Sequence, residues 1–271
     1  MTKLVVKSLT VAVLAMSALA ANAADASVTG NVITGTGIAN GGFTVGTGNN
    51  IEIGLRARER YGSPVGLNFQ PTNNTYSNND GTYNHAPGGF TSTASPLGTA
   101  GGTRASWNFD WSINTNQIPS AIGAATTNVS AYTYRLSMDF DPGVGTNFQT
   151  FDLINAAAFF DHSFGNNATA QSAGVEAANA AGYDNLKNNN NLVQNSWNYD
   201  FFDSVTFPFD PNAQGTYTIK LEAFGTATGI ALASSTINVN VGAAAVPEPG
   251  SMALVGLALA GLAVMRRRRK V

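Results

Sequence analysis

Short stretches in which apolar and polar residues alternate recur along this chain, and they constrain its fold more than any other feature. In residues 51–58, Ile51, Ile53 and Leu55 alternate with polar or small residues. A period of two is that of a β-strand with one buried face. The same alternation occurs at residues 107–112, 132–140, 197–201, 205–209, 217–223 and 237–241, and residues 28–34 are a further candidate strand.

Clusters of Gly, Asn and Pro separate these stretches. Several short strands joined by such turns predict a mainly β chain, folded as an antiparallel β-sandwich of the immunoglobulin-like or jelly-roll type. Two stretches depart from the pattern. Residues 68–102 are predicted to form a long surface excursion, and the Ala-rich residues 168–187 to form one short helix. Strands of the same character flank both stretches, so residues 24–245 are predicted to form one extracytoplasmic domain.

The last 26 residues, 246–271, have a separate organisation. Pro247 and Pro249 stiffen an extended entry, an uncharged apolar run follows over residues 251–265, and five basic residues, 266–270, come next. A helix of that length spans about 22 Å, short of a hydrocarbon core of about 30 Å. The basic cluster suits an anionic cytoplasmic membrane surface, which favours a transmembrane helix with the preceding chain outside the cytoplasm. An ordinary C-terminal anchor and a buried helix are the alternatives.

This tail resembles the PEP-CTERM sorting signal. The residues that carry the resemblance are Pro247, Glu248, Pro249, Arg266, Arg267, Arg268 and Arg269. The resemblance implies an exported protein of a Gram-negative bacterium that makes extracellular polysaccharide. It also implies a precursor anchored in the inner membrane, which exosortase processes on its way to the cell surface, outer envelope or extracellular matrix.

The N-terminus agrees with export. Lys3 and Lys7 precede an apolar run over residues 8–20, and Ala21 and Ala23 are the small residues that signal peptidase requires. We therefore expect residues 1–23 to form a signal peptide that is cleaved after Ala23. A retained N-terminal anchor is the alternative.

The region between the two terminal segments is acidic. Residues 24–246 contain 7 Lys and Arg against 15 Asp and Glu, a net charge of −8. This charge argues against nucleic-acid binding. Arg56, Arg58 and Arg60 alternate along one predicted strand and are expected on an ordinary solvated face. The chain has no Cys, so its stability outside the cytoplasm must come from burial, without disulfides.

An internal echo relates residues 107–111, Trp-Asn-Phe-Asp-Trp, to residues 197–201, Trp-Asn-Tyr-Asp-Phe. The pattern records either two paired strands or a duplication. Packing in the sandwich core is the favoured role of these aromatic side chains. The alternative is a platform for sugar rings, with Trp107, Trp111, Trp197 and Tyr199 as the glycan contacts.

Acidic residues near turns are the candidate metal ligands. Asp139, Asp141, Asp200 and Asp203 could supply oxygens to Ca²⁺, but they lack the spacing of a calcium-binding loop, and Asp-Pro sequences are also ordinary turn chemistry. No other cofactor is indicated.

No catalytic signature accompanies the two histidines, His85 and His162, so we expect no enzymatic activity. The sequence favours a structural or adhesive surface protein that contacts extracellular polysaccharide. A glycan-binding or Ca²⁺-binding module is the alternative.

Overall fold

The computed structural model describes residues 25–33, 37–38, 40–59, 81–85, 89–91, 103–118, 127–155, 161–225 and 229–242. The predicted signal peptide and the sorting signal, including the helix predicted over residues 251–265, lie outside these ranges. Within them, no helix has the length and apolar character needed to cross a membrane.

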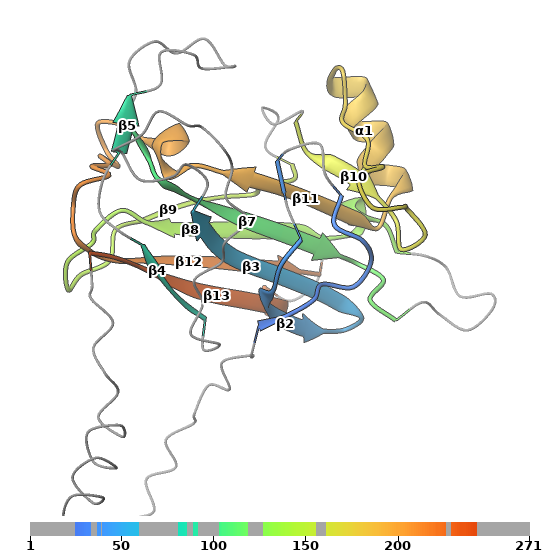
Figure 1. The fold of residues 1–271 in the computed structure, drawn as a ribbon. Helices are drawn as coiled ribbons and strands as arrows, with labels where there is room; N and C mark the ends of the chain where they lie inside the picture. The colour runs from blue at the N-terminus through green and yellow to red at the C-terminus, as the bar shows by residue number, and fades with distance from the viewer. Residues whose placement is uncertain are drawn as a thin grey trace, which may run out of the picture.

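Two large sheets form the body of the protein (Figure 1). The first sheet is antiparallel throughout and has the order β1 (Asp25–Ala26), β2 (Phe43–Gly48), β3 (Ile51–Glu59), β7 (Trp107–Asn114), β11 (Leu192–Trp197) and β10 (Ser163–Gly165). The second has the order β4 (Thr82–His85), β13 (Ala231–Val241), β12 (Gly215–Phe224), β8 (Thr133–Asp139) and β9 (Phe148–Phe151). A small hairpin pairs β5 (Gly89–Thr91) with β6 (Thr103–Ala105).

The sheets lie face to face around one shared apolar core. Ile53 and Leu55 from β3 belong to the same buried cluster as Leu136 from β8 and Ile219 from β12. The sheets approach closely between β2 and β13, where a Cβ added to Gly46 would lie 1.7 Å from a backbone oxygen of β13. The predicted mainly β class and the layered arrangement are confirmed. The antiparallel prediction needs one correction, because β4 pairs with β13 in parallel.

Five predicted strands correspond to observed ones, namely β3, β7, β8, β12 and β13. The strand predicted at residues 197–201 is wrong beyond Trp197, because the side chain of Asn198 takes over the strand hydrogen bonds. Its amide nitrogen donates to the carbonyls of Ala105 and Trp107 at 2.9 and 3.1 Å, and its oxygen accepts from the amide of Asp200 at 3.2 Å. A short 3₁₀ helix, η2 (Tyr199–Phe202), follows.

The strand predicted at residues 205–209 is also wrong, since residues 205–207 form bends and residues 208–209 are irregular. Pro208 has no N–H group to donate to a sheet, and Val205 is fully exposed. Of the segment predicted as a surface excursion, residues 82–85 and 89–91 instead form β4 and β5. Residues 28–33 form no strand; the N-terminal pairing is limited to β1.

The predicted helix exists but begins later than expected. The helix α1 (Ala180–Asn189) starts after Asn179, whose side-chain oxygen accepts from the amide of Gly182 at 2.9 Å. The preceding residues 171–179 form a turn, irregular structure and a bend, with Ser172 at a positive φ of 65° and Val175 bridged to Phe164. The cap residue rather than the alanine content therefore sets the start. A second 3₁₀ helix, η1 (Val129–Ala131), precedes β8.

Candidate functional site

The central strands of the first sheet are buried on both faces. Every residue of β7 and β11 is buried, as are residues 51–58 of β3. One face carries the apolar side chains of the shared core. The opposite face is polar, with Glu52, Arg56, Asp110, Ser112 and Gln194 among its buried side chains.

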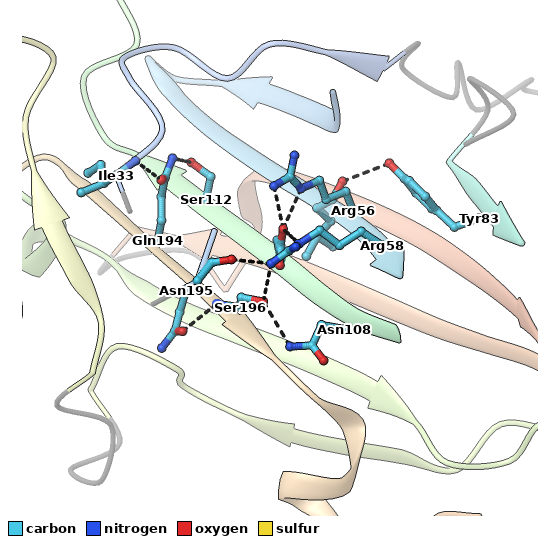
Figure 2. Close-up of polar contacts among 12 residues, drawn as sticks. Ile33, Arg56, Arg58, Tyr83, Asn108, Ser112, Gln194, Asn195 and Ser196 are labelled. Atoms are coloured by element: carbon cyan, nitrogen blue, oxygen red, sulfur yellow. Dashed lines mark hydrogen bonds and ion pairs between the residues drawn. The ribbon is translucent and has the colours of Figure 1, made fainter. Parts of the chain in front are cut away.

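Two arginines and one aspartate form a charge cluster on this polar face, and Figure 2 shows the two arginines, Arg56 and Arg58. One carboxylate oxygen of Asp110, Oδ2, accepts from Nε and Nη2 of Arg56 at 2.8 and 2.7 Å and from Nε of Arg58 at 2.7 Å. Arg56 lies directly opposite Asp110 across the β3–β7 pair. All three side chains are essentially inaccessible to solvent. The other oxygen, Oδ1, has no hydrogen-bond partner within the described ranges.

The prediction that Arg56 and Arg58 occupy a solvated face is therefore wrong; Arg60 lies outside the described residues. The physical reason is that the N-terminal segment, residues 27–33 and 37–38, contacts this face. Glu52 accepts from the backbone N and the hydroxyl of Thr29 at 2.6 and 2.8 Å, and Gln194 accepts from the backbone N of Ile33 at 2.8 Å. Arg58 also donates to the carbonyl of Gly37.

Electrostatics explains why this face can be buried. The two positive charges of Arg56 and Arg58 are matched in number by the negative charges of Glu52 and Asp110. Buried charges are tolerated where they are paired and hydrogen-bonded. Arg56 additionally stacks over the ring of Phe43 at 4.2 Å. These hydrogen bonds and ion pairs hold the N-terminal segment against the first sheet.

The aromatic side chains considered as a platform for sugar rings are buried in the structure. The side chains of Trp107, Trp111, Trp197 and Tyr199 are all at most 2% exposed. They pack on one another, with Trp111 and Trp197 centred 5.4 Å apart and Trp107 and Tyr199 5.3 Å apart. The favoured role in core packing is therefore confirmed and the alternative as glycan contacts is wrong, because Trp107, Trp111 and Trp197 point from β7 and β11 into the shared core and Tyr199, in η2, packs against Trp107.

Three of the four acidic Ca²⁺ candidates, Asp139, Asp141 and Asp203, accept hydrogen bonds from backbone N–H groups of nearby turns, as Asp141 does from Gly143 at 2.8 Å. Asp139 accepts from the backbone N of Asp141 and of Asn147 at 3.0 and 2.7 Å, and Asp203 accepts from the backbone N of Phe209 at 2.8 Å. Burial is the main cause of a raised pKa for Asp200. No group of three or more acidic, His or Cys side chains that could hold a metal occurs within the described ranges.

Both histidines are structural members of the core. Nδ1 of His162 lies 2.7 Å from the hydroxyl of Tyr183, and that hydroxyl also lies 2.9 Å from the carbonyl oxygen of Ile154. Burial lowers the pKa of His162 to about 3. His85 stacks on Trp107 at 5.9 Å, and burial lowers its pKa to about 4. Both side chains are therefore neutral near pH 7.

A pocket of about 330 Å³ lies at the end of the sheet where β7 stops. Six asparagines and one alanine line it: Asn116, Asn128, Asn166, Asn167, Ala168, Asn189 and Asn191. They come from separate parts of the chain, after β7, before η1, after β10 and around the end of α1. Figure 1 shows α1 and β10 at this end of the molecule.

A network of amide hydrogen bonds holds the pocket wall. The oxygen of Asn167 accepts from the amide nitrogens of Asn114 and Asn191 at 2.8 and 3.0 Å, and its own nitrogen donates to the carbonyl of Asn116 at 2.7 Å. Asn191 also donates to the oxygen of Asn114 at 2.8 Å. The wall is thus fixed by side chains whose hydrogen-bonding groups constrain one another.

Sequence reasoning missed this pocket. A signal was present, because asparagines cluster at the ends of the observed strands β7 and β10 and in residues 188–191. Asparagine is also a common turn residue, so only the folded arrangement distinguishes a pocket wall from ordinary turns.

Comparison with known proteins identifies the C-terminal segment. Residues 245–269 match the family model of the PEP-CTERM protein-sorting motif. This match confirms the predicted sorting signal, which includes Pro247, Glu248, Pro249 and Arg266 to Arg269. The motif indicates an exported protein that is sorted via the membrane and processed by exosortase. No curated protein and no solved structure gives a significant match to the chain.

Proposed function

We propose that this protein is a structural or adhesive component of the bacterial cell surface or extracellular polysaccharide matrix, and that it is not an enzyme. The observation that carries the proposal is the sorting motif at residues 245–269, which follows directly on a β-rich body. In this proposal signal peptidase removes residues 1–23, and exosortase processes the tail during transfer from the inner membrane to the cell exterior.

The folded body has properties that suit a structural protein. The central strands of its first sheet are covered on both faces, and the buried charges of that sheet, Glu52, Arg56, Arg58 and Asp110, are engaged with one another or with the N-terminal segment. The histidines are buried and uncharged near pH 7, which supports a packing role for them. A cysteine-free chain gains stability from such covered faces without depending on oxidation.

The processing step is tested by the mass of the mature protein from cells with active exosortase. We expect a chain that begins at Ala24 and lacks the basic C-terminus. Replacing Pro247, Glu248 and Pro249 with alanine should leave the protein unprocessed in the membrane fraction, while Asn147→Ala, an exposed change in the body, should be processed normally. A wild-type mass that extends through Val271 would refute exosortase processing.

The structural role is tested separately in a deletion strain. We expect loss of matrix cohesion or surface attachment, restored by the wild-type gene and not by the variant with the altered tail. Full cohesion in the deletion strain would contradict the structural role. A substrate turnover that disappears when paired carboxylates are replaced would instead establish an enzyme.

A further inference from the structure

The asparagine pocket presents hydrogen-bonding groups that the protein itself leaves unused. Asn191 and Asn116 are 2% and 9% exposed, yet Oδ1 of Asn191 and Nδ2 of Asn116 make no hydrogen bond within the part of the chain that the structure describes. Both residues line the pocket. At its rim, Oδ1 of Asn189 and Nδ2 of Asn166 are likewise uncommitted among the described residues. The pocket therefore offers acceptors and donors together.

The chemistry of the lining selects against charged and apolar ligands. The lining residues carry no ionisable group, so an ion would be desolvated there without a counter-charge. Ca²⁺ binds through several oxygens that normally include carboxylates, and the amide N–H groups on this wall would repel it. Ala168 supplies the single apolar side chain of the lining, too little surface for a hydrophobic ligand.

Hydroxyl groups match this wall, since each can donate one hydrogen bond and accept others. A volume of about 330 Å³ lies at the small end of the range for small-molecule pockets, about 300–1,000 Å³. The internal bonds of Asn167 hold the wall in place before a ligand arrives, which lowers the entropic cost of binding.

The pocket also lies far from the point where the chain leaves the body. The backbone N of Gly242 donates to the carbonyl of His85 at 2.9 Å, and His85 stacks on Trp107 at the start of β7. The pocket lies beyond Asn114, at the other end of that strand, and seven steps along a strand cover about 23 Å. A body tethered through its C-terminus would thus present the pocket away from the tether.

We infer that this pocket binds a carbohydrate through its hydroxyl groups. The inference goes beyond the proposed function, because it concerns a ligand of the folded body and does not depend on how the tail is processed.

The test uses the processed protein purified from the producing cells. The first probe is an array of neutral hexose and N-acetylhexosamine oligosaccharides, followed by calorimetric titration with the oligosaccharide that gives the strongest signal. We expect binding that changes little between low and high salt, because no charge lines the pocket. CaCl₂ is titrated in parallel as the second probe.

The test variant combines Asn116→Asp, which turns an amide donor into an acceptor of nearly the same shape, with Asn189→Ala at the rim. Two lost hydrogen bonds should weaken sugar binding by about tenfold or more. The matched control is Asn147→Ala, in an exposed loop near the opposite end of the sandwich, and it should bind like the wild type. Thermal unfolding of each variant verifies that it is folded.

Three results would overturn the inference. They are no oligosaccharide bound by the wild type, undiminished binding by the folded double variant, and binding of Ca²⁺ rather than sugar by the wild type.

Discussion

Replacing Asp110 with alanine tests how much the buried charge cluster of the first sheet contributes to stability. The substitution removes the shared acceptor of three contacts at 2.7–2.8 Å and leaves the guanidinium groups of Arg56 and Arg58 without it. Each hydrogen bond to a charged group contributes about 1.5–3 kcal/mol, but the three share one oxygen and are not additive. Removing one partner of a buried ion pair costs about 3–5 kcal/mol, and we expect a loss of that size in the free energy of unfolding.

Urea unfolding followed by tryptophan fluorescence measures this loss. All three tryptophans are at most 2% exposed, so their emission reports on the core. A loss of about 3–5 kcal/mol is a large share of the total of about 5–15 kcal/mol typical of a domain, so the midpoint should shift strongly or the protein should unfold. The control is Asp184→Ala, which breaks the ion pair between the exposed Asp184 carboxylate and Lys187 at 3.0 Å and should cost about 0.5 kcal/mol.

A second variant separates uncompensated charge from lost contacts. Arg56→Met, Arg58→Met and Asp110→Leu together replace the cluster with apolar side chains, which is often neutral or stabilising at buried ion clusters. We expect this triple variant to be more stable than Asp110→Ala alone. The reasoning is refuted if Asp110→Ala costs less than about 1 kcal/mol, or if the triple variant is the less stable of the two.

Two further predictions concern the core. His85 and His162 have pKa values lowered by burial to about 4 and about 3, so between those values and about 6.5 the unfolded chain binds protons that the native chain does not. Each histidine should therefore lower the free energy of unfolding by up to about 1.4 kcal/mol per pH unit as the pH falls below 6.5. Unfolding measured from pH 7 to pH 4 should show a weaker dependence of this free energy on pH for His162→Phe than for the wild type. An unchanged pH dependence would contradict the burial of a neutral His162. Gly46→Ala places a Cβ 1.7 Å from the backbone oxygen of Ser234 and should cost about 2 kcal/mol or more, whereas Gly182→Ala in α1 meets only ordinary contacts and should stabilise by about 0.5–1 kcal/mol. Equal thermal midpoints for these two variants would contradict the close approach of the sheets.

The strand content was predictable because alternation is a local property. Ile53 and Leu55 in β3 and Phe109 in β7 predict a buried strand face from the local sequence alone. The burial of the opposite face was not predictable from the same pattern. Arg56 and Asp110 stand at the polar positions of the alternating pattern. The pattern would be the same if that face were exposed to water, and it does not reveal that a polar segment containing Thr29 covers the face.

Other features depended on long-range contacts that no local pattern encodes. Asn198 ends β11 because its side chain reaches Ala105 and Trp107, more than 90 residues earlier in the chain. The pocket is similar, since Asn116 and Asn191 become neighbours only when β7 and β11 pair. The sorting signal is the opposite case, because its three parts are contiguous and could be recognised without any fold.

The N-terminal contacts limit where the exported chain can begin. Thr29 binds Glu52 with both its backbone N and its hydroxyl, and Asp25 and Ala26 pair with Thr44 and Phe43. Cleavage after Ala23 would retain all of these contacts. Cleavage beyond Thr29 would leave the Glu52 carboxylate buried without two of its donors, at a cost of about 1–3 kcal/mol or more for a charged group. Because Thr29 and Ile33 help to cover the charged face, complete coverage of that face requires that any cleavage of the N-terminus occurs before Thr29.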